Sequence, residues 1–137
     1  MNSQTPVEIV KAIADHGELK GVSHARRYGC DDGNDYVVKF TTITKTTVNE
    51  LVGGKLASHL GLPVPKISFV AISKELVDSS ESNVDAGLHL GIQFLERAVD
   101  FEGIDIDESN LYIKNSYVLP GVWCFDNWVL NGDRCNP

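Results

Sequence analysis

The sequence has little of what a metal centre or a disulfide scaffold needs. Its three cysteines, Cys30, Cys124 and Cys135, form no C-x-x-C pair and lie far from any histidine cluster. Its four histidines are scattered along the chain. Zinc sites and disulfide frameworks both depend on closely spaced ligands or paired cysteines, so the sequence predicts reduced thiols and no metal site built from these residues.

Clustered positive charge and long apolar runs are also missing. Twelve Lys and Arg residues against nineteen Asp and Glu residues give a formal charge of −7, which disfavours a nucleic-acid partner because phosphate backbones attract basic clusters. No apolar run is long enough to span a bilayer, and the start, MNSQTPVEIV, lacks the basic-then-apolar order of a signal peptide. We therefore expect a cytoplasmic protein without a membrane partner. Its 137 residues, 42% of them hydrophobic, suffice for one ordinary domain with a buried core.

The most informative stretch spans residues 36–65, YVVKFTTITKTTVNELVGGKLASHLGLPVP. Its first six residues alternate with the two-residue period of a half-buried strand, which places Lys39 on the face opposite Val38. Apolar residues then recur at helical spacing over residues 48–60, and a following glycine and proline provide the stop. The pattern predicts a helix laid against a strand, with Glu50 in the first helical turn and within reach of Lys39.

Lys39 and Glu50 each have two interpretations. A strand lysine followed by a helix glutamate resembles the nucleotide-clamping pair of the protein-kinase fold, in which the lysine holds phosphates and the glutamate holds the lysine. Thr47 and Glu50 also fit the T-x-x-E capping box of a helix start. Lys39 also fits a solvated residue on a sheet face. Spacing does not choose between these interpretations.

The sequence before this stretch predicts a hairpin. Strong turn formers at positions 32–34, DGN, separate two strand-like runs, residues 23–30 and 36–41. Gly17 and Gly21 precede the hairpin and either let the backbone approach phosphates or form a simple turn, because a full G-x-G-x-x-G is absent. The first segment, PVEIVKAIADHGELKG, fits both a helix start and an alternating strand.

Beyond the helix, strand and loop patterns follow each other. Residues 66–73, KISFVAIS, alternate as a strand, and residues 78–85 form a polar run typical of a loop. Residues 87–101 contain another strand that ends near Glu96 and Arg97. The next segment, GIDIDESN, carries Asp105, Asp107 and Glu108 but lacks the D-x-[DN]-x-[DN]-G spacing of a calcium loop. It therefore predicts a solvated loop and a helix start.

The last part of the chain changes to a helical pattern. Pro120 lies near a helix start, and Trp123, Phe125 and Trp128 follow within a heavily apolar stretch. Such a helix needs a covering surface. If it is left uncovered, we expect self-association through Trp123 and Trp128.

The ordered motifs DDGNDYVVKF, NELVGGKLASHLGLPVP, GLHLGIQFL and FDNWVLNGDR resemble the HipA-like kinase family, bacterial proteins with the protein-kinase fold. The resemblance runs from about Val7 to Pro137. It implies an α+β fold: a mostly antiparallel N-terminal nucleotide-binding sheet with one crossing helix, residues 1–100, precedes the first helices of a C-terminal lobe, residues 101–137. It also implies that the ambiguous first segment is a strand.

The resemblance further implies a set of roles for an ATP-binding serine/threonine kinase. Lys39 would pair with ATP phosphates and Glu50 with Lys39. Asp133 would be the catalytic aspartate, acting on a protein substrate, and Mg²⁺ would accompany ATP. The loop over the phosphates would run from Gly17 through Gly21 and Val22 to Ser23, and the backbone of Glu96, Arg97 and Ala98 would be the hinge that faces adenine.

The chain departs from the family pattern near its end. The asparagine that holds magnesium in the family would follow Pro137, a further metal-binding aspartate would lie downstream, and Cys135 replaces the histidine that commonly follows the D-R pair. Metals supply much of the charge neutralisation in phosphoryl transfer, so we expect ATP binding with negligible transfer, in a fragment or a truncated gene product. The alternative is a non-catalytic module that binds a protein partner through its sheet or through Trp123 and Trp128. A plain α+β domain with a fortuitous Lys39–Glu50 pair is a third interpretation.

Overall fold

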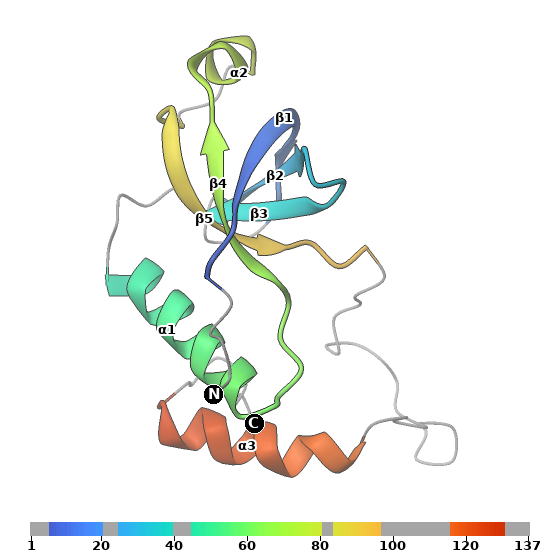
Figure 1. Ribbon diagram of the computed structural model, residues 1–137, viewed down its shortest axis with the longest axis vertical. Helices are drawn as coiled ribbons and strands as arrows, with labels where there is room; N and C mark the ends of the chain where they lie inside the picture. Colours follow the sequence, from blue (N-terminus) through green and yellow to red (C-terminus); the bar gives the residue numbers. More distant parts are fainter. Residues whose placement is uncertain (1–5, 21–24, 40–44, 81–83, 97–115, 131–137) are drawn as a thin grey trace. The chain divides into compact units, whose positions relative to one another are not determined.

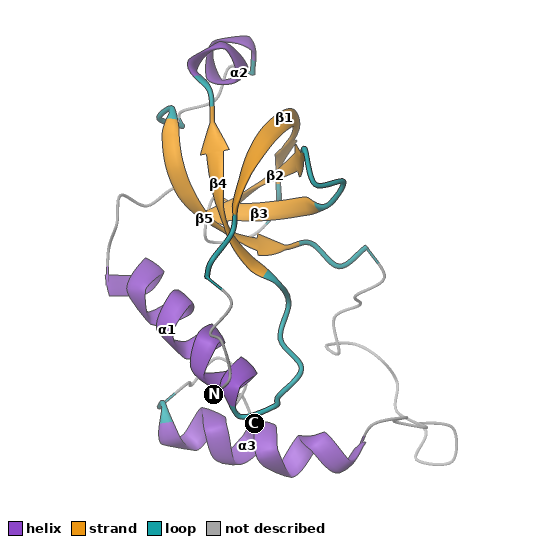
Figure 2. Ribbon diagram, in the orientation of Figure 1, coloured by secondary structure: helices purple, strands orange, loops and turns teal. Residues whose placement is uncertain are grey.

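Figure 1 shows the computed structural model of the protein, which describes residues 6–20, 25–39, 45–80, 84–96 and 116–130. The chain divides into two compact units, one of residues 1–52 and 65–95 and the other of residues 53–64 and 96–137. The chain contains both strands and helices (Figure 2), which confirms the α+β class. The elements are β1 (Ile9–Glu18), β2 (Ala25–Cys30), β3 (Asp35–Lys39), α1 (Lys45–His59), β4 (Ile67–Ile72), α2 (Lys74–Ser79), β5 (Gly87–Gln93), the 3-10 turn η1 (Ser116–Val118) and α3 (Leu119–Trp128). The predicted lobe boundary at residue 100 stays a prediction.

The strands form one closed barrel in the order β1-β2-β3-β5-β4. β1 and β4 pair in parallel, with Ile9 opposite Phe69, and the other neighbours pair antiparallel. The expectation of a mostly antiparallel sheet is confirmed, and the first segment, ambiguous by pattern, is a strand. Closure of the sheet was not predicted, because it depends on a pairing between segments far apart in the chain.

The core lies inside the barrel and follows the alternation of the strands. In β3, Tyr36 and Val38 are fully buried while the residues beside them are partly exposed, since successive strand side chains point to opposite faces. Gly91 of β5 lies against Tyr36 and against Val70 of β4. The rest of the buried cluster consists of Val10, Ala12, Tyr28, Cys30, Val70, Ile72 and Val84.

Two local predictions around the helices are wrong. The capping-box interpretation of Thr47 and Glu50 fails because α1 already begins at Lys45, so that Glu50 lies in its second turn. The loop predicted over residues 78–85 is wrong at its start, because α2 continues to Ser79. Short helices depend on caps and tertiary packing more than on their own sequence. In α2 the Ser73 side chain accepts the Leu76 N–H at 3.3 Å, and Leu76 and Val77 pack against the core.

A polar network ties together the chain segments at one end of the barrel. Lys66, just before β4, donates to Glu8 at 2.9 Å and to Asp32 in the β2–β3 turn at 3.1 Å. The Tyr36 hydroxyl donates to the same Asp32 oxygen at 2.8 Å and accepts a hydrogen bond from Ser68 at 3.4 Å. The network therefore links this turn to the starts of β1 and β4, the two strands that pair in parallel.

The network keeps its charged groups ionised. Burial by itself would raise the pKa of Asp32, but hydrogen bonds from Asn34, Tyr36 and Lys66 hold that pKa well below its usual value. The hydrogen bond to Glu8, followed by those to Tyr36 and Asp32, raises the pKa of Lys66. Attraction between these charges therefore stabilises the barrel at neutral pH.

Replacing Asp32 by asparagine is expected to lower the free energy of unfolding by about 1 kcal/mol at neutral pH, because a charged hydrogen-bonding partner is lost at a partly exposed site. A carboxyl whose pKa is depressed by folding contributes stability above its unfolded pKa, near about 4, and loses that contribution as the pH falls towards its folded pKa. The stabilities measured by urea denaturation for the wild type and Asp32→Asn should therefore draw together gradually as the pH falls from about 4 towards the folded pKa of Asp32.

Asp31→Asn is the matched control for this prediction. Asp31 is exposed in the same turn, and an asparagine oxygen can still accept the Lys11 N–H that the Asp31 carboxylate accepts at 2.9 Å. We expect Asp31→Asn to unfold close to the wild type. An equal loss in both variants, or a loss in Asp32→Asn that persists at low pH, would show that the network does not act through the charge of Asp32.

Candidate functional site

The structure brings Lys39 and Glu50 together in an ion pair. Lys39 is the last residue of β3 and follows the fully buried Val38, so the alternation of the strand directs it to the other face. Its ammonium group donates a hydrogen bond to Glu50 Oε1, from the second turn of α1. The two side chains are 39% and 23% exposed. The ammonium group is thus fixed by a carboxylate and still partly open to solvent.

An ammonium group in this setting can bind an anion. It carries three N–H donors, and one of them is directed at Glu50. An exposed ion pair contributes about 1 kcal/mol or less to stability, so the main consequence of the pair is a fixed position for the positive charge. Phosphate oxygens accept strong, charge-assisted hydrogen bonds from such a group.

A bulge near the end of β1 is shaped by a carboxylate. Gly17 has a φ of +96° and the pairing with β2 shifts register around it, a backbone geometry that favours glycine. Asp15 Oδ1 accepts the Gly17 N–H at 2.8 Å, and Asp15 Oδ2 accepts a hydrogen bond from Arg26 Nη2 at 2.9 Å. Gly17 therefore lies within β1, whereas the sequence predicted it at the start of a loop.

Sequence reasoning missed Asp15 and Arg26 as partners of this bulge. The D-x-G spacing of residues 15–17 is the signal that was available, because Asp side chains often accept the N–H two residues further on. Arg26 carries no comparable signal. Its contact with Asp15 depends on the register in which β2 pairs with β1.

Strand pairing also brings the start of β2, and Leu19 just after β1, towards Lys39. Ala25, the first residue of β2, is the partner of Lys39 in β3. The Leu19 N–H, just after β1, donates to the Ala25 carbonyl oxygen at 2.7 Å. The loop residues predicted to cover phosphates, Gly21, Val22 and Ser23, lie outside the described residues. Their role stays a prediction.

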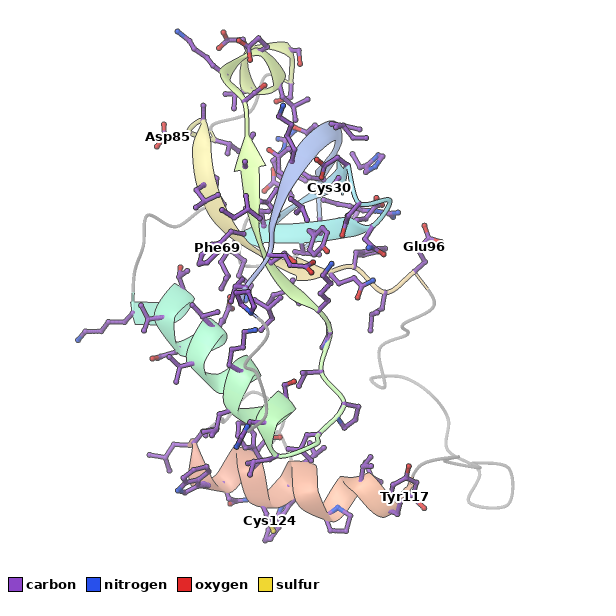
Figure 3. The ribbon with its side chains drawn as sticks, in the orientation of Figure 1. Cys30, Phe69, Asp85, Glu96, Tyr117 and Cys124 are labelled. Atoms are coloured by element: carbon purple, nitrogen blue, oxygen red, sulfur yellow. The ribbon has the colours of Figure 1, made fainter. Side chains whose placement is uncertain are left out.

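Of the three residues in the predicted hinge, the structure describes Glu96 alone. β5 ends at Gln93, earlier than the predicted strand end near Glu96, and Glu96 is exposed on the segment that leaves the sheet (Figure 3). Arg97 and Ala98 lie outside the described residues, as does Asp133. Among the predicted site residues that are described, Lys39 and Glu50 are the pair in contact.

The described residues contain no group of three or more His, Cys, Asp or Glu side chains that suits a metal ion. Cys30, labelled in Figure 3, is buried and Cys124 is exposed, and both are free thiols. Burial, aided by the charges of Asp32 and Asp31, raises the pKa of Cys30 to about 12. The Cys30 thiol is therefore protonated and unreactive at neutral pH.

α3 exposes large apolar side chains. Pro120 lies in its first turn, and Phe125 packs edge-on against Trp128 with ring centroids 6.4 Å apart. Trp123 and Trp128 are 66% and 67% exposed. Self-association through these side chains stays a prediction. In the part of the chain that the structure describes, no helix combines the length and apolar character needed to cross a membrane.

Comparison with known proteins identifies one family. A family model described as HipA-like kinase matches residues 9–136, a range that includes β1 through α3 and both residues of the ion pair. No curated protein and no solved structure gives a significant match to the chain.

Proposed function

The chain belongs to the HipA-like kinase family, and from this premise we propose that it binds ATP, with the Lys39 ammonium group on the phosphates. Family membership supports a kinase-like function in general. The observation that carries the finer proposal is the Lys39–Glu50 ion pair. It joins a strand lysine to a helix glutamate in the arrangement by which kinases hold nucleotide phosphates.

The described residues at the Lys39–Glu50 ion pair suit an anionic ligand. Lys39 offers a positive charge whose position Glu50 fixes and whose surface is partly open. The formal charge of −7 repels ATP at long range, but charges further apart than roughly 8 Å are screened at physiological salt. The affinity for ATP therefore depends on hydrogen-bond donors close to its phosphates. Among the described residues, Lys39 is best placed to supply these donors.

The remaining roles in the proposal follow the family pattern. The backbone of residues 96–98 contacts adenine, and the connection that contains Gly21, Val22 and Ser23 covers the phosphates. Asp133 accepts the hydroxyl proton of a serine or threonine in a protein substrate. Bound Mg²⁺ would supply neutralisation of the phosphate charges.

The proposed contact with the phosphates rests on a single, partly exposed ammonium group, which gives weak binding. We expect an affinity in the millimolar range, about −4 kcal/mol.

Titration of the isotopically labelled chain with ATP, in the presence and absence of Mg²⁺, tests the proposal by NMR. We expect saturable shifts at the Lys39 and Glu50 amides and at Glu96, with smaller shifts for adenosine at the ion pair. The amides of α2 are the internal control, because α2 lies after β4 and contains none of the proposed site residues. No shifts up to several times the expected millimolar dissociation constant would contradict ATP binding by this chain.

A second candidate function rests on the exposure of α3. Trp123 and Trp128 together present a large apolar surface, and such surfaces often mark sites of protein–protein contact. A non-catalytic interaction module would use this surface without ATP. The titration separates the two candidates, because the module predicts no ATP-dependent shifts at Lys39.

A further inference from the structure

The β2–β3 turn and the start of β3 hold the segment that leaves β5. After β5 ends at Gln93, the Phe94 N–H donates to the Asp35 carbonyl oxygen at 2.8 Å. The Gln93 N–H donates to the Lys66 carbonyl oxygen at 2.8 Å, and the Gln93 side-chain amide donates to Asn34 Oδ1 at 3.0 Å. The backbone is therefore fixed for one residue beyond the end of the strand.

A side-chain contact then orients Phe94. The guanidinium carbon of Arg27, in β2, lies 4.2 Å from the centre of the Phe94 ring. Arg27 Nε donates to Asp35 Oδ2, and Nη2 forms an ion pair with the same oxygen. The carboxylate fixes the plane of the guanidinium, which can then stack on the aromatic face. The Arg27 and Asp35 side chains are only about a quarter exposed, at 25% and 23%, so water screens the contact only in part.

We propose that Arg27 and Phe94 are positioning residues for adenine binding. Glu96, where the proposed hinge begins, follows Phe94 by two residues. The Asp35 carbonyl holds the Phe94 backbone and Arg27 holds the Phe94 ring, so together they fix the residue from which the chain continues to Glu96. This inference rests on the proposed function, because it assigns to these residues a part in the ATP site.

Loss of the Arg27–Phe94 contact can be distinguished from loss of the Lys39–Glu50 ion pair by its effect on binding, because the two lie at different places along β3. Phe94 is held beside Asp35, the first residue of β3, whereas Lys39 is the last residue of that strand. Loss of the Arg27–Phe94 contact should therefore change the adenine end of the site and leave the phosphate end in place. A general loss of structure would affect both ends.

Binding of ATP and of inorganic tripolyphosphate to the 137-residue chain provides the test. In Arg27→Gln and Phe94→Leu, ATP affinity should fall roughly fivefold, as expected for loss of a partly buried cation–π contact. Tripolyphosphate affinity should stay the same. Phe94→Tyr keeps an aromatic face for Arg27 and should retain the affinity of the wild type for ATP.

The two substitutions should also act as one unit. The double variant should lose little more ATP affinity than either single variant, because each change alone already removes the contact. This inference would be overturned if the wild type binds ATP and both single variants keep the wild-type ratio of ATP affinity to tripolyphosphate affinity. If Phe94→Leu fails to fold, the ATP and tripolyphosphate affinities of Arg27→Gln and Phe94→Tyr still test the inference. Absence of ATP binding by the wild type would overturn the proposed function instead.

Discussion

Lys39→Met should weaken ATP binding roughly 10- to 100-fold, the factor that corresponds to loss of one or two charge-assisted hydrogen bonds. Methionine keeps most of the unbranched stem of lysine and removes the ammonium group that Glu50 holds. The free energy of unfolding should change by less than about 1 kcal/mol, because the ion pair is partly exposed. NMR titration with ATP and urea denaturation measure the two quantities separately.

Lys74→Met is the matched control for this result. Lys74 is an exposed lysine at the start of α2, so its removal changes the net charge of the chain by the same amount. ATP affinity should stay within about twofold of the wild type if only screened, long-range charge is lost. Equal losses in the two variants would mean that Lys39 acts through net charge, and the proposed contact with phosphate would be wrong.

Gly91→Ala should lower the free energy of unfolding by about 2 to 3 kcal/mol, the usual cost of forcing an extra methyl group into a packed core. A Cβ atom at position 91 would lie 2.5 Å from Val70 Cγ2 and 3.1 Å from Tyr36 Cβ. Both neighbours are fully buried, so neither can move aside without disturbing the barrel. Urea denaturation followed by far-ultraviolet circular dichroism measures the loss.

Gly29→Ala offers a comparison within the same barrel. Gly29 also lies in a strand, but the atom nearest to its added Cβ would be Nε2 of the His16 side chain, at 2.9 Å. His16 is 44% exposed and can rotate away. The loss should therefore stay below about 1 kcal/mol. Similar losses for Gly29→Ala and Gly91→Ala would indicate that strand propensity, rather than the contacts of Gly91 with Val70 and Tyr36, determines the result.

Local patterns in the sequence predicted much of the barrel. The two-residue period predicted β3 and β4, and the D-G-N turn predicted the β2–β3 hairpin, because strand alternation and turn geometry depend on near neighbours. The helical spacing predicted α1, although its start at Lys45 shifts Glu50 into the second turn. α2 was missed, since a helix of six residues depends on its cap and on packing.

The candidate site was predictable in part for the same reason. Lys39 and Glu50 are 11 residues apart and lie on consecutive described elements, so a strand period and a helix period were enough to suggest that they meet. Arg27 and Phe94 are separated by much of the chain. Their contact needs the β2–β3 hairpin and also the pairing of β3 with β5, and no local pattern specifies the second of these pairings.

The sequence by itself determined the α+β class, the family, the hairpin of β2 and β3 and the two residues of the ion pair. These features follow from periodicity, turn chemistry and motif order, which act over short stretches of chain. Only the tertiary structure decided the closure of the barrel through β1 and β4, the network that joins Glu8, Asp32 and Lys66, and the stacking of Arg27 on Phe94. These contacts join residues that lie far apart in the sequence, and no local pattern predicts them. They form only when strands pair in one register around a shared core.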